Sequence, residues 1–388
     1  MPRNPNKINY NKGLPKALIS FQVIEDPRSG GNKRHHFGAV LFMVVSGVLC
    51  GMNTFSDIEE FCKLQLPWLK KWVKIPHGIP RAQTFSNIFA IIDIALFNKC
   101  LIDHIGALHP QLQQQLIAID GKKLRGSHGL TCEASHAVSA WAADSGITLA
   151  QEFVKDKSNE LTAIPRLLEM LNLEGQIVSI DAVGTHTHIA QAIIDKKADY
   201  LLALKGNQGN LHKEAQDQFH YAKRNLDLTQ AEGWSSYENV EKNHGRIVTR
   251  TVIVNHQLDW LNTEIKEKWP QLKSLIMIEN STTHLDSTKE TREIRYYISS
   301  LTSNAQQQGA HIRQHWSIEN SCHWVLDTAF REDHNQTSQG HAAKNLGTVR
   351  RIVMNLLKND QTYQKSTPKK RLKALLDKNY RDKLLSLA

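Results

Sequence analysis

Leu116-Ile117-Ala118-Ile119-Asp120 is a short apolar run that ends in a carboxylate, and Ile177-Val178-Ser179-Ile180-Asp181 repeats this form further along the chain. Continuous apolar runs of this length predict strands of a sheet that helices cover on both faces. Further strands are expected at 137–143, 147–155 and 200–204, and helices at 161–171 and 189–197. The order strand-strand-strand-helix-strand-helix-strand predicts an α/β fold.

The segment before this core, residues 1–105, is expected to form a small helical domain. An apolar helix is predicted at 37–50 and an amphipathic helix at 84–105, and Ser56 and Glu59 have the spacing of a capping box. Such short helices around loops fit a DNA-binding helix-turn-helix, but other helical domains share the pattern.

The segment after the core divides into three parts. Residues 206–300 carry a polar helix and strand-like stretches at 247–255, 274–279 and 294–301, which predict a β-rich insertion. Residues 310–330 return to a helical pattern. From residue 356 onward the chain is expected to form a basic helical tail.

The composition is that of a folded globular protein. With 388 residues, 40% of them hydrophobic and 22% charged, a disordered or collagen-like chain is excluded. The longest apolar stretch, 39–52, is shorter than the roughly 20 residues that cross a bilayer. Five cysteines without a Cys-x-x-Cys pair argue against a disulfide framework and favour a reducing cytoplasm.

The formal charge of +10 is concentrated at the two ends of the chain. Residues 344–388 contain 12 Lys/Arg and 3 Asp, a net charge of +9, and residues 1–40 contain 7 Lys/Arg and 2 acidic residues, a net charge of +5. Basic ends favour a polyanionic partner, most simply nucleic acid, although a solvated basic surface gives the same composition.

Asp120 and Asp181 are the first candidates for chemistry. If their strands are neighbours in one sheet, the two carboxylates meet at its end, where both stay ionised only if a cation neutralises them. Carboxylate oxygens are the ligands that Mg²⁺ and Mn²⁺ prefer. In the alternative interpretation, each Asp only caps the turn that follows it.

Glu319 is the candidate for a third carboxylate. It lies next to an apolar stripe of predicted helix, formed by Ile318, Cys322, Val325 and Ala329. A helix laid against the sheet could present Glu319 to the two aspartates, although a surface glutamate fits the same pattern. Other candidates for the third position are Asp327, Glu332 and Asp333. Three carboxylates can hold two divalent ions about 4 Å apart, which supports phosphodiester chemistry on DNA or RNA.

Several blocks of the sequence resemble one family. Ile119-Asp120-Gly121-Lys122-Lys123-Leu124-Arg125-Gly126-Ser127 resembles the first-aspartate motif of the bacterial H-repeat-associated transposases of the ISAs1 type, which are related to the IS4 group. Ile180-Asp181-Ala182 and residues 199–208 resemble the second-aspartate block. His244-Gly245-Arg246 matches a piece of the insertion, and residues 315–333 resemble the glutamate block. The likeness covers about residues 15–355.

The resemblance implies an RNase H-like DDE transposase. Its fold would be a mixed sheet flanked by helices, interrupted by a β-rich insertion at about 206–300. The catalytic domain would span 106–355. It would follow a helical associated domain at 1–105 that binds DNA and precede the basic tail at 356–388. Asp120, Asp181 and Glu319 would be the catalytic and metal-binding triad.

The resemblance also implies partners and cofactors. The triad would hold Mg²⁺ or Mn²⁺, with two ions expected. The partners would be double-stranded DNA, both the terminal inverted repeats and the target, and a second copy of the chain in a synaptic complex inside a bacterial cell. The sequence departs from the IS4 group where that group has Arg and Lys around the glutamate, because His315 and Leu326 stand there.

A wider set of residues, most of them basic, is expected to contact DNA. This set comprises Lys122, Lys123, Arg125, Lys205, Asn207, His244, Arg246, Arg313 and His323, the last two as substitutes for the missing Arg and Lys. Two other functions stay open. The chain could be a catalytically inactive, transposase-derived DNA-binding protein, or a metal-dependent hydrolase that uses Asp181, His186 and His188.

Overall fold

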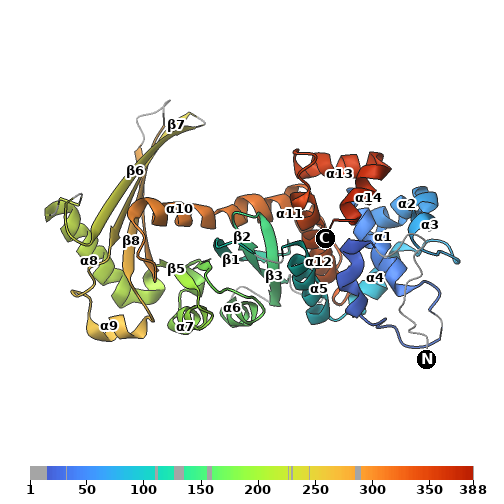
Figure 1. Cartoon of the computed structure of the whole chain (residues 1–388), viewed down its shortest axis with the longest axis horizontal. Helices are drawn as coiled ribbons and strands as arrows, with labels where there is room; N and C mark the ends of the chain where they lie inside the picture. Colours follow the sequence, from blue (N-terminus) through green and yellow to red (C-terminus); the bar gives the residue numbers. More distant parts are fainter. Residues whose placement is uncertain are drawn as a thin grey trace.

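The computed structural model describes residues 15–31, 33–109, 112–125, 135–154, 160–225, 227–228, 230–243, 245–284 and 290–387. Figure 1 shows an elongated molecule with three parts along its length. Helices from both ends of the chain lie at one end, the strands that carry the two aspartates lie in the middle, and long antiparallel strands lie at the other end.

One sheet runs through the middle and the far end. In the described part of the chain it has nine strands in the order β3-β2-β1-β4-β5-β9-β8-β7-β6. β1 pairs in parallel with β4 and β4 with β5, whereas β2 runs antiparallel to both β1 and β3. The expected mixed α/β fold with an RNase H-like core is therefore confirmed. The strands are β1 (Leu116–Lys123), β2 (His136–Ala142), β3 (Ile147–Val154), β4 (Ile177–Ile180), β5 (Asp199–Leu204), β6 (Trp234–Asn243), β7 (Arg246–Asn255), β8 (Ser274–His284) and β9 (Glu290–Ser299).

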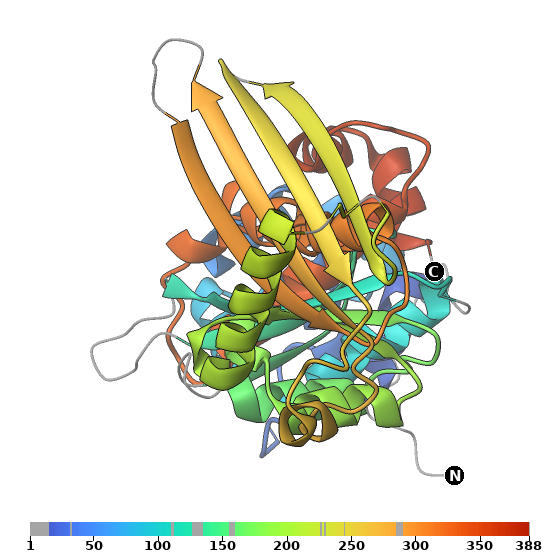
Figure 2. The same ribbon diagram turned by 90° about the vertical axis from the view of Figure 1, so that its left-hand side faces the viewer.

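The insertion extends this sheet instead of forming a separate layer. β6 to β9 form an antiparallel meander, and β9 pairs with β5 at the edge of the core. β7 is buried at its core end, from Val252 to Asn255, and only partly buried beyond it. Figure 2 shows the outer ends of these strands reaching past the body of the molecule. β6 was not predicted, because its residues, WSSYENVEKN, lack an apolar run.

Helices cover both faces of the core strands, as the apolar strands require. α6 (Glu160–Glu169) and α7 (Thr187–Asp195) lie on one side in Figure 1, and α10 (Ala305–His315) lies on the other. α10 contacts β1 and β4 and also reaches β6, β7 and β8, so it connects the core to the meander. α8 (Gly209–Asn225) and α9 (Thr263–Lys268) complete the insertion.

The helical end of the molecule is built from both ends of the chain. α12 (Ala342–Asn359) packs against helices of the N-terminal segment, and the indole N–H groups of Trp68 and Trp72 donate to Asp382 at 2.8 and 3.2 Å. Residues 356–387 are therefore packed into the helical body and do not stand apart as the tail that was expected. The other elements here are η1 (Lys16–Val23), α1 (Phe37–Leu49), α2 (Phe55–Leu64), α3 (Leu66–Trp72), α4 (Ala82–Ile91), α5 (Ile94–Leu108), α13 (Thr367–Leu376) and α14 (Lys378–Leu385).

Much of the C-terminal positive charge is buried. Arg371 donates to the Val48 carbonyl at 2.8 Å, and Lys370 donates to the Leu357 and Asp360 carbonyls at 2.6 and 2.7 Å. These bonds satisfy carbonyl groups that water cannot reach. The expectation that this basic segment forms a surface for nucleic acid is thus wrong for its buried members, which are Arg350, Arg351, Lys370, Arg371 and Arg381.

Two helix boundaries differ from the sequence prediction. The capping box of α2 uses Thr54 and Asp57, two residues earlier than predicted, because Glu59 accepts the Ala82 N–H at 2.6 Å instead. The single helix expected at 84–105 is two helices, α4 and α5, since Asp93 caps a new helix by accepting the Leu96 N–H at 2.9 Å. An amphipathic pattern that continues across both segments concealed this break.

The apolar stretch near the N-terminus forms α1, and every residue of this helix is buried against the rest of the protein. Within the described ranges, no single helix combines the length and the apolar composition needed to cross a membrane. Only α4 and α5 taken together reach those values, and they bend by 93° between them.

His104, on α5, gives the fold a predictable pH dependence. It is 2% exposed, and burial, with a smaller contribution from His109, lowers its pKa to about 4. The unfolded chain, with a histidine pKa of about 6.5, therefore binds this proton first as the pH falls. We expect the free energy of unfolding to decrease between about pH 6.5 and pH 4, by up to about 3 kcal/mol from this residue. Denaturant unfolding at pH 7 and pH 4.5 measures this decrease in the free energy of unfolding. In His104→Leu the decrease should be smaller by the contribution of His104, and a decrease equal to that of the wild type would contradict the assignment.

Candidate active site

Asp120 and Asp181 lie side by side at one edge of the sheet. In the parallel pairing of β1 and β4, Ile119 is opposite Ile180, so the two aspartates follow at the same level. Asp181 also caps η4 (Ala182–Gly184), where its Oδ1 accepts the Val183 and Gly184 N–H groups at 3.0 and 3.3 Å. Asp181 therefore caps the turn, and its charge helps to raise the pKa of Asp120, but Asp181 is not among the three residues whose ligand atoms cluster at this edge.

Gly121, directly after Asp120, is required by close packing. A Cβ atom at this position would overlap Glu160 Oε1 and lie 2.5 Å from His136 Nε2. Those two buried side chains contact each other at 2.5 Å and close over the strand. The glycine of the Ile-Asp-Gly motif thus lets a covering layer approach the backbone next to the first aspartate.

Glu319 reaches this edge from a helix with one wide turn. Residues Ile318–His323 form a π-helical segment between α10 and α11 (Trp324–Thr328), where a single predicted helix was expected. Such wide turns occur often at functional sites.

Side chains from three strands hold this helical segment on the sheet. Trp141 Nε1, on β2, donates to Ser317 Oγ at 3.0 Å, and Ser179 Oγ, on β4, is 2.8 Å from His315 Nδ1. On β3, Thr148 Oγ1 lies 3.6 Å from Cys322 Sγ. The position of Glu319 is therefore fixed from both sides.

Asp120, Glu319 and His323 form a compact cluster. One ligand atom of each lies within 4.8 Å of the others. His323 Nδ1 is 3.6 Å from Asp120 Oδ2 and 3.6 Å from Glu319 Oε2. The His323 side chain is 6% exposed, whereas that of Glu319 is 52% exposed, so the cluster is closed by protein on one side and open on the other.

The electrostatics of the cluster favour a cation. Burial, the Glu319 charge and the Asp181 charge raise the pKa of Asp120. The neighbouring His323 imidazole lowers the pKa of Glu319, and the Lys122 charge adds to this effect. The negative charge of a partly buried aspartate beside two other carboxylates is unfavourable without a positive charge, and a divalent ion supplies one.

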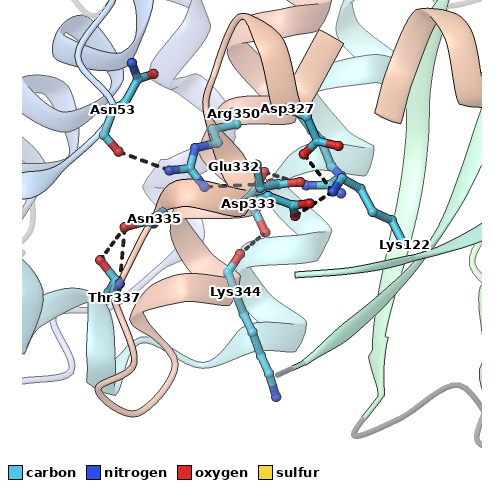
Figure 3. Close-up of polar contacts among 12 residues, drawn as sticks. Asn53, Lys122, Asp327, Glu332, Asp333, Asn335, Thr337, Lys344 and Arg350 are labelled. Atoms are coloured by element: carbon cyan, nitrogen blue, oxygen red, sulfur yellow. Dashed lines mark hydrogen bonds and ion pairs between the residues drawn. The ribbon is translucent and has the colours of Figure 1, made fainter. Parts of the chain in front are cut away.

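The other candidates for the third carboxylate bind cations of the protein itself (Figure 3). Asp327 and Asp333 flank Lys122 Nζ at 2.7 and 2.9 Å. Glu332 is buried, and its Oε1 accepts a bond from Arg351 at 3.0 Å. Burial opposes ionisation of Glu332, but the charges of Arg351 and Arg350 outweigh it and lower its pKa.

Some expected DNA contacts surround the acidic edge. Lys123 and Arg125 are exposed at and just beyond the end of β1. Lys205 and Asn207 are exposed directly after β5, which ends at the same edge because it is parallel to β4. Asn207 also donates to the Ala182 carbonyl at 2.7 Å, so it ties this loop to the turn after Asp181.

The remaining expected contacts lie elsewhere. Lys122 is buried between the carboxylates of Asp327 and Asp333, and His323 is buried next to those of Asp120 and Glu319. Neither side chain is therefore exposed for contact with DNA. Arg313 is exposed and pairs with Glu241 of the meander. Arg246 is exposed at the start of β7, and His244 lies outside the described residues.

A cavity with arginines in its lining, the cationic cavity, lies beside α10, and of its lining residues only Arg313 was predicted from the sequence. Its volume is about 270 Å³, and it lies between α10 and β7 to β9. Arg295 lies over the Trp316 ring at 4.9 Å, and Arg250 Nε donates to Asn280 Oδ1 at 3.0 Å. Arg295 pairs with Glu293 and Arg313 with Glu241, while the Trp316 ring is partly exposed beside them. Arginines next to an aromatic ring can bind phosphates and bases. The cavity is lined by Arg250, Ile278, Asn280, Arg295, Tyr297, Gly309, Ile312, Arg313 and Trp316.

The hydrolase alternative gains no support from the geometry. His186 and His188 have ring centroids 5.7 Å apart, but among the described residues they do not form a three-ligand group with Asp181.

His315, at the position of the IS4-group Arg, is half-buried and bonded to Ser179, and burial lowers its pKa to about 4. Leu326 is fully buried. Neither residue takes the place of the Arg and Lys of the IS4 group on the surface.

Comparisons with known proteins cover most of the chain. A family model described as DDE_Tnp_1-associated matches residues 18–105, and one described as Transposase DDE domain matches residues 111–356. "Putative transposase YncI" of Escherichia coli O157:H7 is 36% identical, with 96% of this chain and 95% of that protein aligned. "H repeat-associated putative transposase YhhI" of E. coli K12 is 34% identical, with 95% of this chain and 97% of that protein aligned. A chain of the piggyBac transposase synaptic complex with hairpin DNA aligns with a TM-score of 0.49 and 9% identity, over 97% of this chain and 78% of that one.

Proposed function

The chain belongs to the family of transposases with a DDE domain, and from this premise we propose that it cuts DNA at the ends of an insertion sequence and joins those ends to target DNA. One observation carries the proposal. Asp120 and Asp181 directly follow the last paired residues of the parallel strands β1 and β4, and Glu319 lies close to Asp120. Three carboxylates gathered at one sheet edge are the ligands that metal-dependent phosphodiester chemistry uses.

The donor set fits Mg²⁺ or Mn²⁺. Asp120 and Glu319 offer oxygen ligands close together, and Asp120 is held in surroundings that disfavour its own negative charge. Asp120, Asp181 and Glu319 would hold the ions, two in number by our proposal. When bound, such ions activate the attacking hydroxyl or water and stabilise the leaving oxygen.

The protein's own residues would place the DNA. Lys123, Arg125 and Lys205 flank the carboxylates and would bind phosphates on either side of the bond to be cut. Asn207 and the Asp181 cap keep the two loops of this edge together. Because two element ends must be held at once, we propose that a homodimer is the active species.

The direct test is cleavage of a duplex that carries the terminal repeats flanking the gene. With Mg²⁺ or Mn²⁺ the purified protein should nick this duplex at the repeat ends, and excess EDTA should stop the reaction. Binding of the repeats without any metal-dependent cleavage would support the inactive DNA-binding protein instead.

The cationic cavity should contribute to DNA affinity. Arg250→Ala and Arg295→Ala each remove one cation between α10 and the meander. Each lost phosphate contact lowers the slope of log affinity against log salt by about 0.9. We expect weaker binding with this smaller slope, measured by fluorescence anisotropy from 50 to 200 mM salt. Arg166→Ala is the matched control, because Arg166 is an exposed arginine on α6 at the opposite face of the sheet. Equal losses in all three variants would contradict a role for the cavity.

A further inference from the structure

We propose that His323 is a metal ligand of the active site, so that one ion is held by two carboxylates and one imidazole. The inference rests on the proposed function, since it concerns the same metal centre. It adds a nitrogen donor to a site that the acidic triad alone would make entirely of oxygen.

The first argument is the separation of the three side chains. His323 Nδ1 lies 3.6 Å from both Asp120 Oδ2 and Glu319 Oε2, which is longer than the 2.7–3.2 Å usual for an N–H···O hydrogen bond. Two ligand atoms that share one ion, each about 2.1–2.2 Å from it, lie roughly 3.0–3.6 Å apart at tetrahedral to octahedral angles. The imidazole therefore stands at the distance of a co-ligand.

The second argument is burial. His323 is 5% exposed, and its Nε2 has no hydrogen-bond partner among the described residues. Burying an imidazole is unfavourable, and a metal ion at Nδ1 would engage one of its two nitrogens. Nδ1 points to the two carboxylates and is available for that purpose.

The third argument is the local backbone. Glu319 and His323 are four residues apart within the π-helical segment, and both reach Asp120 from it. The contacts of Ser317 with Trp141 and of Cys322 with Thr148 hold this segment at both ends. The geometry is therefore set before any ion binds, as a metal site requires.

A nitrogen donor has a consequence for metal choice. Mg²⁺ takes oxygen ligands almost entirely, whereas Mn²⁺ binds more tightly than Mg²⁺ where nitrogen is present. We expect the protein to favour Mn²⁺ over Mg²⁺ more strongly than a site of carboxylates alone would.

The test measures Mn²⁺ binding to the full-length protein without DNA. Titration calorimetry gives the affinity, and pulsed EPR detects hyperfine coupling of the bound Mn²⁺ to nitrogen. The wild type should show coupling to one imidazole nitrogen. His323→Asn offers an amide oxygen near the position of Nδ1, so it should still bind Mn²⁺ but without the coupling. His323→Leu removes the donor and should weaken Mn²⁺ binding by about 10–100-fold.

His188→Gln is the matched control, because His188 is an exposed histidine outside the cluster and is the ligand that the hydrolase alternative would use. It should retain the nitrogen coupling, and thermal unfolding of each variant separates a folding defect from loss of a ligand. Coupling that persists in His323→Asn, or disappears in His188→Gln, would overturn the inference. A wild type that binds Mn²⁺ without nitrogen coupling would also overturn it while leaving the proposed function intact, whereas no Mn²⁺ binding at all would count against both.

Discussion

Asp120→Asn, Asp181→Asn and Glu319→Gln are each expected to reduce DNA strand cleavage by at least about 1,000-fold, because each removes a negative oxygen ligand at the sheet edge. A loss of this size corresponds to about 4 kcal/mol of transition-state stabilisation, within the several kcal/mol that a metal site supplies. Binding of the terminal-repeat duplex should change by less than about threefold, because the carboxylates repel phosphate and do not bind it. Single-turnover cleavage and fluorescence anisotropy measure the two effects.

The matched control is Asp195→Asn, which makes the same replacement at an exposed position on α7 and should leave cleavage unchanged. Asp327→Asn tests another candidate for the third ligand. Asp327 is engaged with Lys122, so this variant should retain most of the activity. If Asp327→Asn abolished cleavage and Glu319→Gln did not, the third carboxylate would be assigned to the wrong residue.

Glu332→Gln is expected to lower the free energy of unfolding by about 3–5 kcal/mol, the cost of removing one partner from a buried ion pair. Glu332 Oε1 lies 3.0 Å from Arg351 and 3.8 Å from Arg350, and all three side chains are at most 2% exposed. The variant leaves two buried guanidinium groups without their acidic partner. Arg350 also donates to the Asn53 carbonyl at 3.0 Å, so the loss should loosen the junction between the N-terminal helices and the core (Figure 3).

Denaturant unfolding at pH 7 measures this effect. The control is Glu174→Gln, which breaks the exposed 3.1 Å pair with Lys197 and should cost less than about 1 kcal/mol. If Glu332→Gln cost no more than this control, the buried cluster would not stabilise the fold as its geometry indicates. DNA cleavage by the folded fraction of Glu332→Gln should persist, because this carboxylate is not among the proposed ligands.

Part of the candidate site could be read from local sequence. Asp120 and Asp181 each end an apolar run, and two adjacent parallel strands necessarily present their carboxyl ends at one edge. Glu319 was identifiable from its place beside an apolar helical stripe. The sequence alone did not distinguish Glu319 from Asp327, Glu332 and Asp333. That distinction depends on the cations that engage these three carboxylates, which are Lys122, Arg350 and Arg351 and come from distant segments.

The sequence by itself determined the α/β class, the order of the core strands along the chain and the two aspartates, because apolar runs and their periodicity are local properties. Only the tertiary structure decided which charges are buried and what they bind. Arg371 finds its acceptor on Val48, 323 residues away, and Lys122 finds its carboxylates over 200 residues away. The free energy of a buried charge depends on the groups around it, and those groups are brought together only by the folded chain.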